Sequence, residues 1–197
     1  MYETFINMLP AGSPVRVAFD GKDMEIMVTG PLHDDYADLL DQFVKAVAGE
    51  LGIRMRPLRQ TTWKRPKIKR GIESDNCYYF DPSKIAQALA ARNARSNDVG
   101  DYPDPDLAIE VDISPPQADR PSIYAAMGVE EVWRFDGRAL TIERLDERGE
   151  YQVVERSGFL PVRADQVPRW LLDEDLSDYE AWNRRVRAWA RNELHPQ

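Results

Sequence analysis

The sequence predicts an α/β (α+β) fold, and three segments carry this prediction. The turn pair Asp20-Gly21 lies between the strand-like runs VRVAF and MEIMV, which predicts a hairpin over residues 15–28. Apolar residues at the spacing of one helical face predict a helix over residues 36–51. The alternating segment DPDLAIEVDIS, residues 104–114, predicts a strand built for a core.

Shorter elements lie between the hairpin and the acidic strand. Residues 53–56 predict a short strand, and the run CYYF at residues 77–80 has strong strand character. Residues 83–92 predict a helix that Ser83 opens as its N-cap.

The C-terminal half predicts a helix, three strands and a final helix. Residues 122–127 predict a short helix ended by Gly128, a residue suited to a C-cap. The next segment, EEVWRFDGRALTIERLDERGEYQVVERS, predicts three antiparallel strands joined at two turns that each contain glycine. Aromatic and apolar residues at helical spacing predict a helix within residues 176–194. This helix docks either on the domain or on a second subunit, and both alternatives stay open.

Length and composition limit the class of protein. A chain of 197 residues fits one well-cored domain with a C-terminal appendage, and 43% hydrophobic with 30% charged residues suits a globular enzyme or binding domain. No apolar run approaches the roughly 20 residues needed to span a bilayer, so we expect no membrane partner. The N-terminus lacks the features of a secretory signal, which makes a cytoplasmic location the expectation. The net charge of −8 disfavours indiscriminate nucleic-acid binding, so any DNA contact needs a local basic patch.

Acidic residues share one face of the predicted strand over residues 104–114. Asp106, Ala108, Glu110 and Asp112 lie on that face, opposite an apolar row. Buried carboxylates are costly unless they are paired or bind a cation, so the pattern predicts a divalent-metal site on a central strand. An edge strand whose polar face meets water is an equally weighted alternative. Glu110 and Asp112, about 6.6 Å apart at Cα, can approach one cation cluster, whereas Asp106 lies too far away and belongs to the start of the strand or to a loop.

Soft metal ligands are scarce in this chain. Cys77 is the single cysteine, and His33 and His195 are the only histidines. This excludes an intramolecular disulfide and a zinc site of the usual kind, so any metal is expected to be hard and bound by oxygen. We interpret Cys77 as a small core residue and His33 as a capping or surface residue near the start of a helix.

The order of motifs resembles a known family. A hairpin containing Glu25, a helix opened by LHDDY, the run GIESDNCYYF, the strand PDLAIEVDIS and the segment IYAAMGVEEVWRFDG resemble the Uma-type putative restriction endonuclease family, a branch of the PD-(D/E)XK nuclease superfamily. The resemblance covers roughly residues 19–170. It implies a restriction-endonuclease-like mixed β-sheet flanked by helices, which we expect over residues 1–172, followed by a C-terminal helical appendage over residues 173–197.

The resemblance also implies a chemistry: a hydrolase that cuts DNA phosphodiester bonds with Mg²⁺, for which Mn²⁺ would substitute. Asp75 takes the place of the Asp in the PD motif, and Glu110 takes that of the first acidic residue of (D/E)XK. Both are therefore expected to be metal ligands. Glu25, a catalytic candidate, and His33 match further family positions.

Two departures from the family pattern affect the expected site. Ser74 replaces the Pro of the PD motif. The main consequence is that the backbone φ at this position is no longer fixed by a proline ring. Asp112 stands where the Lys would be, and we expect it to act as an auxiliary acid and further metal ligand. Arg120, on the following helix, is the matching basic candidate. Its guanidinium can clamp phosphate but cannot act as a general base, so water activation falls to the metal or to a carboxylate.

A basic cluster precedes Asp75 along the chain. Five of the seven residues from 64 to 70 are basic: Lys64, Arg65, Lys67, Lys69 and Arg70. Such a cluster could neutralise DNA phosphates and give affinity without sequence choice. A solvated loop is the alternative interpretation.

Three functions from different classes remain open. The leading one is a Mg²⁺-dependent DNA endonuclease, for which a homodimer is one open arrangement. The second is a catalytically degenerate nuclease fold that acts as a nucleic-acid or protein binding module, because the strand Lys is missing. The third treats the carboxylates as a glycosidase pair, and it is the weakest because no aromatic sugar platform lies near the acids.

Overall fold

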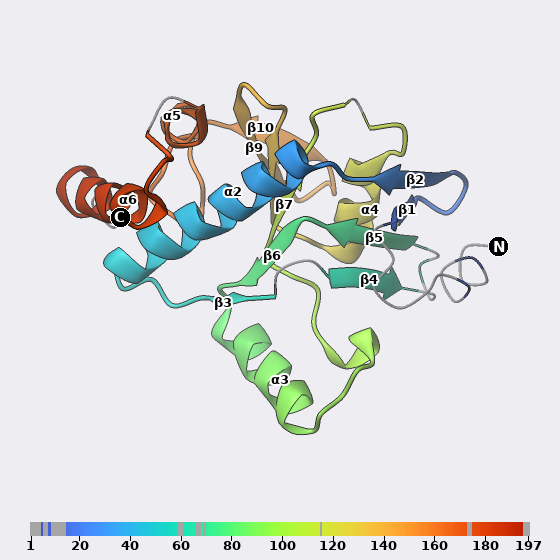
Figure 1. The fold of residues 1–197 in the computed structure, drawn as a ribbon. Helices are drawn as coiled ribbons and strands as arrows, with labels where there is room; N and C mark the ends of the chain where they lie inside the picture. The colour runs from blue at the N-terminus through green and yellow to red at the C-terminus, as the bar shows by residue number, and fades with distance from the viewer. Residues whose placement is uncertain are drawn as a thin grey trace.

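The computed structural model describes residues 15–58, 61–65, 68, 70–114, 116–172 and 175–194, together with Phe5 and Met8. It contains two β-sheets and flanking helices, so the predicted mixed α+β architecture is confirmed (Figure 1).

A small antiparallel sheet carries the N-terminal hairpin. Its strand order is β2 (Met24–Val28), β1 (Val15–Phe19), β5 (Arg70–Ser74) and β4 (Thr61–Arg65). The predicted hairpin is confirmed. Gly21 in its turn has a φ of 96°, a left-handed conformation that glycine adopts without strain.

A larger sheet forms the centre of the fold. Its strand order is β10 (Tyr151–Val154), β9 (Leu140–Leu145), β8 (Glu131–Phe135), β7 (Leu107–Val111), β6 (Asn76–Tyr79) and β3 (Arg56–Pro57). The β7 strand pairs parallel with β8 and antiparallel with β6, and all five of its residues are buried. The edge-strand alternative for the acidic segment is therefore wrong. The three predicted antiparallel strands are β8, β9 and β10, whereas β3 lies at Arg56–Pro57 rather than at residues 53–56.

The helices differ from the prediction mainly at their first residues. The α2 helix (Pro31–Glu50) begins one residue before the LHDDY segment expected to open it, whereas the α4 helix (Arg120–Met127) begins two residues earlier than predicted and ends at Gly128 as expected. The N-cap of α3 (Pro82–Asn93) is Asp81, whose carboxylate accepts hydrogen bonds from the backbone N–H groups of Ser83 and Lys84. The assignment of Ser83 as the cap is wrong, because the longer-reaching carboxylate one residue before Pro82 takes that role. In the described connections lie the short 3₁₀ helices η2 (Val99–Asp101) and η3 (Ala164–Gln166).

Two hydrophobic cores lie on opposite faces of the large sheet. On one face, α2 packs against β7, and α5 (Pro168–Leu172) and α6 (Tyr179–Glu193) pack against α2; on the other face lie α3 and α4. Leu107, Ile109 and Val111 of β7 belong to the first core and Ala108 to the second, as alternation along a strand requires. Glu110 therefore shares the α4 face.

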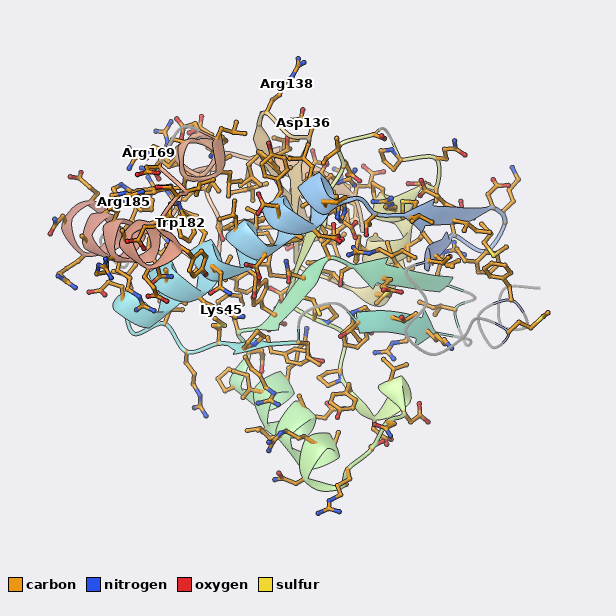
Figure 2. All side chains as sticks on the ribbon, in the orientation of Figure 1. Lys45, Asp136, Arg138, Arg169, Trp182 and Arg185 are labelled. Atoms are coloured by element: carbon orange, nitrogen blue, oxygen red, sulfur yellow. The ribbon has the colours of Figure 1, made fainter. Side chains whose placement is uncertain are left out.

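The C-terminal helix docks on its own chain. Trp182, Val186 and Ala190 of α6 are fully buried in the core that includes α2, and the indole Nε1 of Trp182 donates to the backbone oxygen of Trp170 at 2.9 Å (Figure 2). The apolar stripe predicted from the sequence is thus used within the chain. The division of the chain at residue 172 stays a prediction. No helix among the described residues is long and apolar enough to cross a membrane.

Candidate active site

Asp75 lies where the chain passes from the small sheet to the large one. It is the single residue between Ser74, the last residue of β5, and Asn76, the first of β6. Its backbone N–H donates to the carbonyl of Ile109 at 3.1 Å, and its Oδ2 accepts from the N–H of Val111 at 2.7 Å. Backbone contacts with β7 therefore fix both the position and the orientation of this carboxylate.

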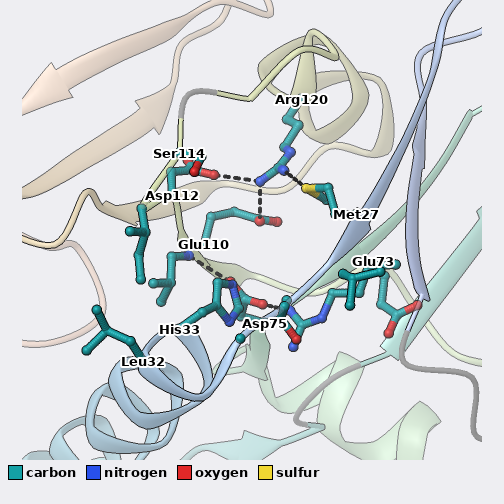
Figure 3. A pocket seen from close by; sticks show the side chains of 15 residues that line it. Met27, Leu32, His33, Glu73, Asp75, Glu110, Asp112, Ser114 and Arg120 are labelled. Atoms are coloured by element: carbon teal, nitrogen blue, oxygen red, sulfur yellow. Dashed lines mark hydrogen bonds and ion pairs between the residues drawn. The ribbon is translucent and has the colours of Figure 1, made fainter.

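A cavity of about 330 Å³ opens at this junction (Figure 3). Its walls come from β1, β2, the start of α2, the end of β5, the end of β7 and the first residue of α4. The ionisable side chains that line it are Arg16, His33, Glu73, Asp75, Glu110, Asp112 and Arg120. Four residues predicted from three separate motifs, Asp75, Glu110, Asp112 and Arg120, thus line one cavity.

Asp75 is 4% exposed and is surrounded by cationic or hydrogen-bonding groups. Nη1 of Arg16 is paired with its Oδ1, and Nε2 of His33 lies 3.2 Å from its Oδ2. Burial and the charge of Arg16 lower the pKa of His33 below its usual value, against the opposing effect of Asp34, so the imidazole is mostly neutral at pH 7. His33 faces the cavity, and the interpretation of it as only a capping or surface residue is incomplete.

Glu110 is 3% exposed, and two side chains from α4 hold it. Nη1 of Arg120 donates to its Oε2 at 2.9 Å, and the hydroxyl of Tyr124 donates to its Oε1. Burial raises the pKa of Glu110 to about 7, although the nearby Arg120 acts in the opposite direction. Glu110 is therefore a carboxyl group that can gain or lose a proton near neutral pH.

Arg120 contacts three acids: Glu110 on β7, Asp112 just after β7, and Glu25 on β2. Its Nη1 also donates to Oδ1 of Asp112 at 2.7 Å, and its Nε donates to Oε2 of Glu25 at 3.3 Å. Burial works against the charged guanidinium, but Glu110, Asp112 and Glu25 outweigh it and raise the pKa of Arg120. Burial also raises the pKa of Asp112, with Arg120 opposing. Arg120 is thus the charged centre of an acidic cluster.

Glu25 supports the cavity from behind Arg120 and is not among the residues that line it. Its carboxylate accepts hydrogen bonds from the backbone N–H groups of Gln117 at 2.9 Å and Ala118 at 3.3 Å, as well as from Arg120. The hairpin therefore fixes the loop that leads into α4. A catalytic role for Glu25 stays a prediction.

The described residues of the basic cluster, Lys64, Arg65 and Arg70, lie away from Asp75. Lys64 and Arg65 end β4 and Arg70 begins β5, about 16 Å along the strand from Asp75. Arg65 donates to the carboxylate of Asp104 at 2.8 Å and to the backbone oxygens of Val99 and Tyr102, so it anchors the loop containing η2. Lys64 and Arg65 line a second cavity, of about 410 Å³. Lys67 and Lys69 lie outside the described residues, and DNA contact by the cluster stays a prediction.

Asp106 and Cys77, two further residues considered from the sequence, have structural roles outside the cavity. Asp106 is fully buried outside the cavity, where it accepts from the N–H groups of Phe80 and Asp81 at 2.6 and 2.8 Å and pairs with Lys84 at 2.5 Å. It joins the end of β6 to the start of β7, as expected for a residue at the start of the strand. Cys77 is fully buried in the second core, in agreement with its interpretation as a core residue.

Sequence reasoning missed Arg16 and Tyr124. Arg16 is the one charged residue in the strand run VRVAF, and Tyr124 follows Arg120 by one helical turn. A charged residue flanked by core positions is a signal for a buried ion pair, but the sequence did not reveal Asp75 as its partner, because the two residues come together only through the pairing of β1 with β5.

The cavity holds carboxylates of the kind that bind hard cations. Mg²⁺ prefers oxygen ligands and typically takes one or two protein carboxylates, so Asp75 and Glu110, with Asp112 beside them, are the residues that could hold it. Each of these carboxylates already contacts an arginine, which shows that the site accommodates positive charge. Within the described parts of the chain, no group of three or more His, Cys, Asp or Glu side chains is arranged to hold a metal ion.

A family model and a solved structure are similar to this chain. The model of the Uma2 family, described as putative restriction endonuclease, matches residues 2–173. The crystal structure of a putative nuclease belonging to DUF820 from Anabaena variabilis matches with a TM-score of 0.57 and 15% sequence identity, covering 86% of this chain and 98% of that chain. At this identity the likeness shows the fold alone. No curated protein matches the chain.

Proposed function

Since the chain belongs to the Uma2 putative restriction endonuclease family, we propose that it is a metal-dependent endonuclease that hydrolyses DNA phosphodiester bonds. The observation that carries the proposal is the convergence of Asp75, Glu110 and Asp112 on one cavity that also contains Arg16 and Arg120. Carboxylates for a cation and guanidinium groups for phosphate are what phosphodiester hydrolysis requires.

Asp75 and Glu110 would hold Mg²⁺ or Mn²⁺, with Asp112 as an auxiliary ligand. The bound cation would supply a hydroxide at neutral pH and neutralise charge on the phosphoryl oxygens. The backbone N–H of Val111 orients Asp75, and the hydroxyl of Tyr124 orients Glu110. Both carboxylates are thus held in place before substrate arrives, which reduces the entropy lost on reaching the reactive geometry.

Arg120 would bind and stabilise the substrate phosphate. It remains protonated, so it can stabilise negative charge that develops on phosphoryl oxygens but cannot take a proton from water. Glu25 holds its Nε, which keeps the guanidinium at the cavity wall. His33, mostly neutral near pH 7, would accept a proton in the same cavity.

A second candidate function is a nuclease fold that binds nucleic acid or protein without cutting. One observation favours it: Nη1 of Arg120 lies between Glu110 and Asp112, so these acids have an internal counterion. In such a module the arginine would stabilise the fold permanently and never give way to a divalent cation.

A plasmid assay separates the two candidates. Supercoiled DNA is incubated with the wild type, Asp75→Ala and Glu110→Ala in Mg²⁺, Mn²⁺ or chelator. Glu131→Gln is the matched control, since Glu131 is a buried acid on β8 that contacts Ser157, Gly158 and Trp133 outside the cavity. The endonuclease proposal expects metal-dependent nicking that both alanine variants lose and the control keeps. DNA binding with no nicking in either metal would favour the binding module.

A further inference from the structure

Arg16 is a buried cation in contact with the carboxylate that we propose as a metal ligand. Its side chain is 9% exposed, and Nη1 is paired with Oδ1 of Asp75. Nη2 lies 3.8 Å from Oδ1 of Asp34, but the side chain of Asp34 is 58% exposed, so water screens this second pair. Asp75 is therefore the buried partner of Arg16.

Asp75 keeps its orientation independently of Arg16. The oxygen that Arg16 contacts is Oδ1, whereas Oδ2 accepts from the N–H of Val111 at 2.7 Å and lies 3.2 Å from Nε2 of His33. The backbone N–H of Asp75 also donates a hydrogen bond to the carbonyl oxygen of Ile109. Arg16 can thus release Oδ1 without loss of the geometry of the carboxylate.

The backbone of Arg16 is held at the cavity wall. Its strand, β1, lies between β2 and β5, and the next two residues, Val17 and Ala18, are each 1% exposed. Glu73 lines the same cavity, so negative charge remains near the guanidinium if the contact with Asp75 is broken. Arg16 would therefore keep an acidic neighbour, and it would stay within the cavity.

We propose that Arg16 has two partners in turn: Asp75 in the metal-free protein, and a phosphate oxygen of the nucleic acid once Asp75 holds a divalent cation. This inference rests on the endonuclease function proposed above. Both partners present oxygen anions that a guanidinium binds through charge-assisted hydrogen bonds. Figure 3 shows Glu110 between Arg120 and Asp75. Arg120 contacts Glu110 and Arg16 contacts Asp75, so the two arginines bind different carboxylates of the cavity.

The first measurement is Mn²⁺ binding to metal-free protein, followed by electron paramagnetic resonance, for the wild type and Arg16→Gln. We expect the variant to bind Mn²⁺ about tenfold more tightly, the size of one charge-assisted hydrogen bond that no longer competes for Asp75. Arg144→Gln is the matched control, because Arg144 pairs with the buried Glu131 at 3.3 Å, outside the cavity. It should bind Mn²⁺ as the wild type does.

The second measurement is the affinity for a short DNA duplex in Ca²⁺, which takes the same oxygen ligands. We expect Arg16→Gln to bind the duplex about tenfold more weakly, since a phosphate contact is lost. Arg16→Lys keeps the positive charge but lacks the planar guanidinium group. Its affinity for Mn²⁺ should therefore rise and its affinity for the duplex should fall, each by less than in Arg16→Gln. If Arg16→Gln does not fold, Arg16→Lys alone is compared with the wild type.

Each outcome decides one step. Unchanged or weaker Mn²⁺ binding in the Arg16 variant would overturn the competition for Asp75, and unchanged DNA affinity would overturn the phosphate contact. A wild type that binds Mn²⁺ and nicks DNA while the Arg16 variant changes in neither measurement would overturn the Arg16 inference alone. A wild type that neither binds Mn²⁺ nor nicks DNA would overturn the endonuclease function with it.

Discussion

Nη1 of Arg120 lies 2.7 Å from Oδ1 of Asp112, the residue that the sequence resemblance places at the lysine position of the (D/E)XK pattern. Positive charge therefore reaches this position from the first turn of α4 instead of from β7. The same nitrogen donates to Glu110 at 2.9 Å. Although the strand has no lysine, this point of the cavity therefore still contains a cation.

Removing the charge of Arg120 should slow cleavage strongly. We expect Arg120→Gln to slow plasmid nicking by about 10²–10³-fold, the usual effect of losing one group that stabilises transition-state charge. Adding Asp112→Lys to that variant should recover part of the rate, because it returns a cation to the strand. Nicking rates of the single and double variants measure this, with Arg144→Gln as control. Equal rates in Arg120→Gln and the wild type would contradict the assigned role.

Glu110 should give metal-free protein an unusual pH dependence of stability. Its pKa is raised by burial from an ordinary 4.5 to about 7, so between these values the folded state binds a proton that the unfolded state releases. This contribution is fully present below about pH 4.5 and is lost as the pH rises through 7. The free energy of unfolding, measured in chelator by urea titration, should therefore fall more steeply over this range in the wild type than in Glu110→Gln. Parallel curves for the two proteins would show that Glu110 has no raised pKa.

Cys77 should be inert in the folded protein. It is fully buried, and burial raises the pKa of its thiol to about 12, so the reactive thiolate is scarce at neutral pH. A thiol reagent should label it only after denaturant unfolds the chain, and Cys77→Ala should keep the nicking activity. Rapid labelling under native conditions would contradict the buried position.

The C-terminal helix should stabilise the whole fold. Trp182 is fully buried between α6 and the core, so Trp182→Ala should lower the free energy of unfolding by about 3–5 kcal/mol. Tyr179→Ala is the control on the same helix, and it should cost about 1 kcal/mol or less because Tyr179 is 38% exposed. Denaturant titrations measure both. Equal small losses would indicate that α6 is an appendage that contributes little to folding.

Elements with strong local signals were predicted from the sequence. The hairpin over residues 15–28 and the three strands β8 to β10 have Gly-containing turns between strand-like runs, and these turns specify pairing locally. The first residues of helices were predicted less well. Asp81 caps α3 in place of Ser83 because a carboxylate before Pro82 competes for the same N–H groups.

The sequence motifs predicted which residues form the candidate site, but they did not predict the ion pairs between these residues and their neighbours. Asp75, Glu110, Asp112 and Arg120 come from segments whose order resembled the family, which the family match confirms. The partner of Asp75 was missed because Arg16 is 59 positions away and reaches it only through strand pairing. The central position of β7 was likewise open, because alternation along one strand does not reveal its neighbours in the sheet.

The most direct test of the central claim follows Mn²⁺ occupancy and plasmid nicking in the same samples of wild type and Asp75→Asn. The account predicts that nicking rises in proportion to bound Mn²⁺ in the wild type, and that Asp75→Asn, folded by circular dichroism, loses both. Nicking that persists in chelator, or that proceeds at the wild-type rate in Asp75→Asn, would contradict a metal-dependent nuclease centred on this carboxylate.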